Sequence, residues 1–100
     1  MNANDAAPGT RRAERSVTIV NKLGLHARAA ARLVQLASTF RSEVRASRAG
    51  REVSAKSIMG VLLLAAAQGS QITLVAEGAD AEEAIEALAA LVAARFGEEA

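Results

Sequence analysis

The sequence contains no cysteine, tryptophan or tyrosine, and only one proline and one histidine. Without cysteine the chain has no disulfides, no thiol chemistry and no Cys-ligated metal site. Aromatic residues make up only 2%, at Phe40 and Phe96, so the platforms on which single-stranded nucleic acid stacks are missing. A net charge of +1 gives no separate argument for a polyanionic partner. We therefore expect no nucleic-acid partner.

Long hydrophobic runs are also missing. The longest apolar stretch, Ile58 to Ala67, is interrupted by Gly60 and is far too short to span a bilayer. Residues 1–15 include a proline, a glycine and three arginines, and lack the apolar segment of a signal peptide. We expect a flexible N-terminal extension over 1–15, one domain over 16–100, a cytoplasmic location and no membrane partner. Nothing in the sequence requires more than a monomer.

Two kinds of hydrophobic periodicity alternate along the rest of the chain. Alternation with period two predicts strands, and apolar residues three or four positions apart predict helices. The expected strands are 16–20, 42–46, 51–55 and 71–76, and the expected helices 27–40, 58–64 and 81–96. The order β-α-β-β-α-β-α indicates an α+β fold with a four-stranded, mostly antiparallel sheet. Three helices would cover one face of this sheet, and the other face would meet solvent, which accounts for the alternation.

Local signals mark the ends of several elements. Ala49 and Gly50 suit a tight turn between two antiparallel strands. Ser57 and Asp80 are expected to cap the second and third helices, and Gly97 to end the third.

The only histidine, His26, lies where the first strand has ended and the first helix begins. A surface histidine that merely caps a helix is the ordinary interpretation of such a residue. Three features favour an anion site instead. A helix N-terminus offers unpaired N–H groups, Arg28 supplies a permanent cation, and Gly24 permits an unusual backbone conformation. Imidazole is a competent nucleophile near neutral pH, yet no catalytic partner is visible, so the site is typical of a carrier rather than an enzyme.

Gly24-Leu25-His26-Ala27-Arg28, followed by Ala30, resembles the active-site motif of the HPr phosphocarriers of the bacterial phosphoenolpyruvate-dependent phosphotransferase system. Lys56-Ser57-Ile58-Met59-Gly60 is similar to the second motif of that family. The resemblance extends from Ser16 to about Phe96 and implies an HPr-like open-faced sandwich. One departure is Ala29, where the family usually has proline. Proline fixes the backbone at the first helical turn, so we expect a modest change in rigidity and no loss of activity.

The resemblance also implies a mechanism. Enzyme I donates a phosphoryl group to Nδ1 of His26, giving a pros-phosphohistidine, and an EIIA-type protein or domain accepts it. Arg28 would neutralise the developing charge, and the backbone N–H groups of Ala27, Arg28, Ala29 and Ala30 would cradle the phosphate. No cofactor is implied, and no metal-ligand set is visible in the sequence.

Ser57 corresponds to the regulatory serine of the family, which an HPr kinase/phosphorylase modifies in hosts that have one. Phosphate at a helix N-terminus is tolerated by the helix, so its effect would fall on partner proteins. Family docking residues correspond to Leu25, Ile58, Met59 and Leu62. We expect Met59 to be exposed, and Val61 and Leu64 to be buried.

Two other functions remain open. One keeps the fold and makes the protein mainly a regulator of the nitrogen-branch or mannose type, with little sugar transport. The Asn21-Lys22-Leu23-Gly24 segment is similar to nitrogen-branch variants. The other is a ferredoxin-like domain that binds RNA or a small ligand, which the missing aromatics and glycine-rich loop disfavour.

Overall fold

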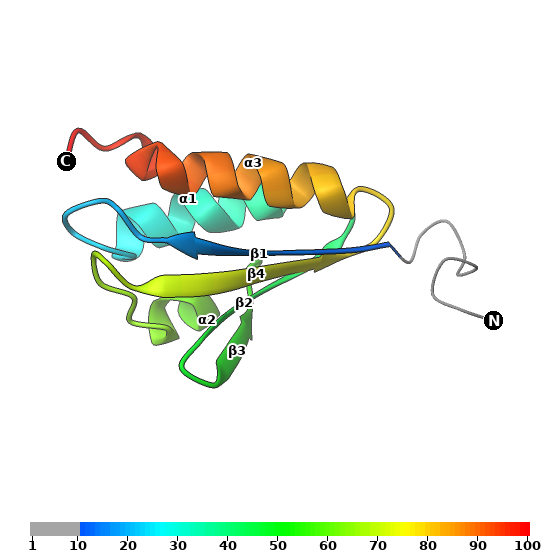
Figure 1. Ribbon diagram of the computed structural model, residues 1–100, viewed down its shortest axis with the longest axis horizontal. Helices are drawn as coiled ribbons and strands as arrows, with labels where there is room; N and C mark the ends of the chain where they lie inside the picture. Colours follow the sequence, from blue (N-terminus) through cyan, green and yellow to red (C-terminus); the bar gives the residue numbers. More distant parts are fainter. Residues whose placement is uncertain (1–10) are drawn as a thin grey trace.

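A computed structural model describes residues 11–100, and Figure 1 shows how its elements are arranged. The elements are β1 (Arg12–Thr18), α1 (Ala27–Ala37), β2 (Glu43–Arg48), β3 (Arg51–Ser54), α2 (Ile58–Leu63), β4 (Gln71–Glu77), α3 (Ala81–Ala93) and the short 3₁₀ turn η2 (Arg95–Gly97). Their order confirms the predicted succession of strands and helices.

The strands form one four-stranded sheet in the order β1-β4-β2-β3. All three pairings are antiparallel. The hairpin between β2 and β3 turns at Ala49 and Gly50, both with positive φ, and brings Arg48 opposite Arg51. Such a two-residue turn matches the right-handed twist of the strands that it joins.

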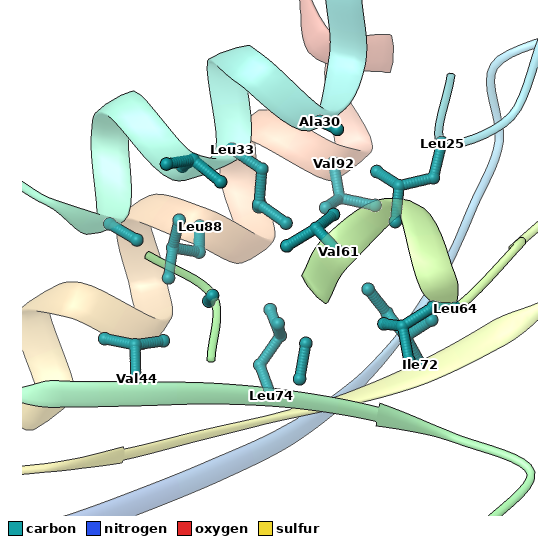
Figure 2. Packing of buried hydrophobic residues seen from close by; sticks show 14 of the residues in the cluster. Leu25, Ala30, Leu33, Val44, Val61, Leu64, Ile72, Leu74, Leu88 and Val92 are labelled. Carbon is teal, nitrogen blue, oxygen red and sulfur yellow. The ribbon is translucent and has the colours of Figure 1, made fainter. Parts of the chain in front are cut away.

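The three helices cover one face of this sheet, as predicted (Figure 2). Leu33 from α1, Leu88 from α3 and Val61 from α2 meet Leu74 of β4, and each of these side chains is fully buried. Burying one such side chain contributes roughly 1.5–3 kcal/mol to stability. The core is almost entirely aliphatic, with Phe96 as its one fully buried aromatic side chain among residues 11–100.

The uncovered face of the sheet is polar. Ser16 on β1 faces Thr73 on β4, with 3.3 Å between their hydroxyl oxygens. On β2, Arg45 forms ion pairs with the carboxylates of Glu43, Glu52 and Glu77. This polar face confirms the inference drawn from the alternating strands.

The first strand begins earlier than predicted. β1 starts at Arg12, so the expected domain boundary at residue 16 falls inside a strand. Arg12 and Glu14 are exposed and form an ion pair at 2.8 Å, while Ala13 packs against the core. Because one face of this part of β1 is solvated and the other carries only a small residue, its sequence has no strong strand pattern and resembles a polar extension. Residues 1–10 of the expected extension lie outside the described residues.

The helix ends also differ from the predictions. α1 ends at Ala37, before the half-buried Phe40, and α3 ends at Ala93 rather than at Gly97. Asp80 precedes α3 but makes no side-chain cap. Its carboxylate instead accepts hydrogen bonds from the N–H groups of Arg41 and Ser42 and from the Ser42 hydroxyl. Within residues 11–100, no helix is long and apolar enough to cross a membrane.

Candidate functional site

The loop that carries His26 is held in place by the segment after α2. The Leu25 N–H donates to the Ala66 carbonyl oxygen at 2.8 Å. Gly24 has φ +68°, and a Cβ atom there would lie 2.7 Å from the same oxygen. Only glycine fits this close approach without strain. The positive φ agrees with the unusual backbone conformation expected at Gly24, whereas the close approach to Ala66 was not predicted from the sequence.

His26 is the N-cap residue of α1. Its backbone is extended (φ −75°, ψ 179°), and its Nδ1 accepts a hydrogen bond from the Arg28 N–H at 3.3 Å. The side chain is 28% exposed, so the ring can be reached from solvent. Nδ1 therefore lies at the helix N-terminus, where peptide N–H groups and the helix dipole favour negative charge.

The other ring nitrogen contacts a residue from the far end of the chain. Nε2 of His26 lies 2.5 Å from Oε2 of Glu98, which follows η2. Because Nδ1 accepts a hydrogen bond, it carries no proton in this arrangement, and the proton resides on Nε2, which donates to Glu98. The imidazole thus presents an unprotonated Nδ1 to the helix N-terminus.

Asn21 links this carboxylate to the loop. Its side chain is fully buried, and its Nδ2 donates to the Gly24 carbonyl oxygen at 2.7 Å and to Oε1 of Glu98 at 3.0 Å. These hydrogen bonds from Asn21 and His26 lower the pKa of Glu98 from its ordinary value. Glu98 therefore stays ionised near neutral pH.

Glu98 was not predicted from the sequence. It is 72 residues away from His26, beyond the expected end of the last helix, and no local pattern points to it. Asn21 was noticed only as part of a motif, not as a buried side chain.

The Arg28 side chain is exposed at the start of α1. Together with Lys22 and Arg32 it lines a surface depression of about 540 Å³ that Glu98 also borders. Arg28 lies in the first turn of α1, where its positive charge and the helix N–H groups favour an anion. Arg32 donates to the Phe96 carbonyl oxygen, and Glu99 also borders the depression. Among residues 11–100, no cluster of three or more His, Asp or Glu side chains could hold a metal ion.

The backbone N–H groups at the start of α1 differ in availability. The Ala30 N–H donates to the His26 carbonyl oxygen at 2.8 Å, so this amide is not free for the predicted phosphate cradle. Within residues 11–100, the N–H groups of Ala27 and Ala29 have no hydrogen-bond acceptor. Ala29 is fully buried, so only the Ala27 amide is both unpaired and on an exposed residue, and the Arg28 amide is paired only with Nδ1.

Ser57 caps α2, as predicted. Its Oγ accepts a hydrogen bond from the Gly60 N–H at 3.0 Å, and the residue is half-buried. This contact satisfies one of the N–H groups that a helix start leaves unpaired.

The predicted docking residues are not all at the surface. Met59 is 72% exposed and Ile58 43%, whereas Leu62 is only partly exposed. Leu25 is buried in the core, with 5% exposure, so its assignment to the docking surface is wrong (Figure 2). The hydrogen bond between Leu25 and Ala66 turns this side chain inward.

Other apolar residues are exposed in its place. Leu23 is 69% exposed and Leu63 57%, and neither was predicted from the sequence to be a docking residue. Val61 and Leu64 are buried, as predicted.

An antiparallel four-stranded sheet under three helices, with a single histidine at the first helix N-terminus, defines a small domain of the open-faced sandwich class. Residues 13–94 match the model of the family described as PTS HPr component phosphorylation site. The chain therefore belongs to the HPr family of phosphocarrier proteins of the phosphotransferase system.

Individual relatives agree with this assignment. The chain is 61% identical over 85 residues to phosphocarrier protein HPr of Cupriavidus necator, covering 85% of this chain and 96% of that protein. It is 49% identical to phosphocarrier protein NPr of Shewanella violacea, covering 85% and 93%. A crystal structure of HPr from Thermoanaerobacter tengcongensis superposes with a TM-score of 0.85 at 49% identity, covering 88% of this chain and 99% of that one.

Proposed function

We propose that this protein accepts a phosphoryl group on Nδ1 of His26 from enzyme I and passes it to an EIIA-type protein or domain. One observation carries the proposal. Nδ1 faces the N-terminus of α1, while Nε2 is occupied by Glu98. The nitrogen with the available electron pair is thus the one beside the anion-binding groups.

Transfer to His26 is a single displacement. The Nδ1 electron pair forms a bond to phosphorus, the bond between phosphorus and the donor breaks, and its electron pair stays with the donor. The proton on Nε2 remains on the ring. The protein contributes position and electrostatic stabilisation, which dominate catalysis in phosphoryl transfer.

Arg28 and the backbone amides stabilise the transferred group. Once Nδ1 is bonded to phosphorus, it no longer accepts from the Arg28 N–H, which becomes available for a phosphate oxygen. The N–H group of Ala27, which belongs to an exposed residue, is the other donor of this cradle. The exposed guanidinium of Arg28 adds a permanent positive charge.

Partner proteins dock beside this site on the exposed apolar residues of α2 and of the His26 loop. Helices α1 and α2 pack against each other, which brings the two segments to the same side of the fold. Leu23, Ile58, Met59 and Leu63 expose the apolar surface. The flexible, polarisable side chain of methionine suits a surface that meets both a donor and an acceptor.

Phosphorylation of Ser57 by an HPr kinase/phosphorylase regulates this docking in hosts that have the kinase. After phosphorylation the Ser57 Oγ still lies at the start of α2, bonded to phosphorus and close to the Gly60 N–H. The helix therefore tolerates the modification. The added charge of about −1.5 to −2 lies next to Met59 and Ile58, where it repels an acidic partner surface.

The test is the intact mass of the protein after incubation with enzyme I, Mg²⁺ and phosphoenolpyruvate. Wild type gains one phosphate that is labile in acid and stable in base, and His26→Ala gains none. Arg28→Ala is phosphorylated about 100-fold more slowly, because one charged group at the transferred phosphate is lost. An unmodified wild type in the presence of active cognate enzyme I would overturn the proposal.

Offering the phosphorylated protein to different acceptors separates transport from regulation. Transfer to the EIIA domain of a sugar permease supports the transport role. Transfer only to a nitrogen-branch or mannose-type EIIA protein supports the mainly regulatory role.

A further inference from the structure

We propose that Glu98 is a positioning residue that keeps the ring proton of His26 on Nε2 and thereby keeps Nδ1 ready to attack phosphorus. This inference rests on the proposed function and assigns a role to a side chain outside the residues matched by the family model, which end at 94.

Both oxygens of the Glu98 carboxylate are engaged. Oε2 lies 2.5 Å from Nε2 of His26, and Oε1 accepts from Nδ2 of Asn21 at 3.0 Å. The Glu98 side chain is only 13% exposed, so the carboxylate is largely shielded from water and from screening ions, whereas the His26 ring is 28% exposed. A carboxylate held from both sides cannot rotate freely, which fixes the direction in which it accepts the hydrogen bond from Nε2.

The backbone around Glu98 is anchored as well. Phe96 is buried in the core, its carbonyl oxygen accepts from Nη1 of Arg32, and the Lys22 N–H donates to the Ala100 carbonyl oxygen at 3.0 Å. Arg95, Phe96 and Gly97 have φ of 58°, 54° and 81°. Two successive non-glycine residues in this region cost roughly 1–2 kcal/mol each, so tertiary contacts must hold the turn.

This geometry affects both halves of the transfer. As Nδ1 bonds to phosphorus, the ring acquires positive charge, and the adjacent carboxylate stabilises it, as a carboxylate does for other catalytic imidazoles. When the group moves on, the Nδ1–phosphorus bond breaks and its electron pair returns to Nδ1. The ring leaves as neutral imidazole because Nε2 has kept its proton.

Replacing Glu98 with glutamine gives a sharp prediction. Nδ2 of Asn21 is a donor, so it selects the carbonyl oxygen of the new amide and directs the NH₂ group towards His26. Nε2 must then accept rather than donate, which moves the ring proton to Nδ1. The nitrogen that attacks phosphorus is therefore blocked without any loss of side-chain volume.

The experiment compares ¹⁵N chemical shifts of the His26 ring in unphosphorylated wild type, Glu98→Gln, Glu98→Asp and Glu99→Gln. Glu99 is an exposed neighbouring carboxylate, so its variant controls for the change in charge. Wild type and Glu99→Gln should show the proton on Nε2, and Glu98→Gln should show it mainly on Nδ1. Glu98→Asp, which keeps the carboxylate, should give ring ¹⁵N shifts close to those of wild type.

Initial rates of phosphorylation by enzyme I complete the test. Glu98→Gln should be roughly 10- to 100-fold slower than Glu99→Gln. Equal ring shifts in the two glutamine variants would overturn the proposal. Glu98 would then serve only to hold the C-terminal segment against the His26 loop. Because the ring shifts are measured before phosphorylation, they decide this point even if wild type fails to accept a phosphoryl group.

Discussion

At the scale of single residues, the polar side chains with the strongest local effects join segments far apart in the sequence. Asn21 and Glu98 connect the His26 loop to the end of the chain. Asp80 connects the start of α3 to the turn before β2 through Arg41 and Ser42. Each carboxylate accepts several hydrogen bonds, which favours its ionised form.

Asp80 makes the free energy of unfolding depend on pH in the acidic range. Hydrogen bonds from the Ser42 hydroxyl and from the Arg41 and Ser42 N–H groups lower the pKa of Asp80 to about 2, from 3.8. A lowered pKa in the folded state means that the stabilisation is complete above about pH 4 and is lost as the pH falls through 2. Asp80→Asn should therefore unfold at a lower temperature than wild type at pH 7, and the difference should narrow between pH 4 and pH 2.

Glu82→Gln is the matched control, because Glu82 is an exposed carboxylate in the first turn of α3. It should change the thermal midpoint little at either pH. A difference between wild type and Asp80→Asn that stays constant down to pH 2 would contradict this account.

His26, Arg28 and Ser57 could be singled out from the sequence because each belongs to a local pattern of glycine, cation or cap that also resembles a family motif. Asp80 was predicted as a cap because that position suits one, whereas the folded chain offers Asp80 three better donors on another segment. Glu98 was not predicted because no periodicity relates residues 72 positions apart. Contacts of this kind follow from tertiary structure.

At the scale of elements, hydrophobic periodicity predicted which segments are helices and strands, but not where they end. The stripe of α3 continues through Phe96 because that side chain is buried, yet the backbone has already left the helix at Ala93. Periodicity reports burial rather than backbone conformation, so it could not show that η2 follows. The first four residues of β1 were not predicted as strand because they bury little apolar surface, so their sequence shows little alternation.

The His26 loop depends on one glycine. Gly24→Ala would require positive φ and place a Cβ atom 2.7 Å from the Ala66 carbonyl oxygen. We expect destabilisation by more than about 2 kcal/mol, since the left-handed conformation alone costs about 1–2 kcal/mol. The ring signals of His26 should shift as well, because the loop must move. Chemical denaturation and ¹⁵N spectra measure the two effects.

Gly50→Ala separates the cost of a positive φ from the cost of a steric clash. Gly50 has φ +83°, but a Cβ atom there would meet nothing within 4 Å. This variant should lose only about 1–2 kcal/mol and leave the His26 signals unchanged. Equal losses in the two variants would show that the contact with Ala66 is unimportant.

At the scale of the whole molecule, the site lies at one end of the sheet. Figure 1 shows the β1–α1 connection, the α2–β4 connection and the C-terminal segment gathered at that end, opposite the start of β1. The hydrogen bonds of Leu25 with Ala66 and of Lys22 with Ala100 join these three segments. His26 is therefore positioned by the complete fold rather than by its own loop.

The position of β1 predicts where the chain can be shortened. A variant that begins at Arg11 keeps all of β1, whereas one that begins at Ser16 loses the pairing of residues 12–15 with β4. We expect the shorter variant to be less stable by at least about 2 kcal/mol, from lost sheet hydrogen bonds and lost packing of Ala13. Equal denaturation midpoints would support the predicted boundary at residue 16 and contradict a stabilising role for residues 12–15. A monomeric state stays a prediction, which sedimentation of either variant tests.

The most direct test of the central claim is to identify which ring nitrogen of His26 carries phosphorus. The protein is labelled with ¹⁵N, phosphorylated by enzyme I and phosphoenolpyruvate, and studied by NMR for coupling between ³¹P and the two ring nitrogens. The account predicts coupling to Nδ1, which faces the N-terminus of α1, with a proton on Nε2. Phosphorus on Nε2, the nitrogen that Glu98 holds, would contradict it.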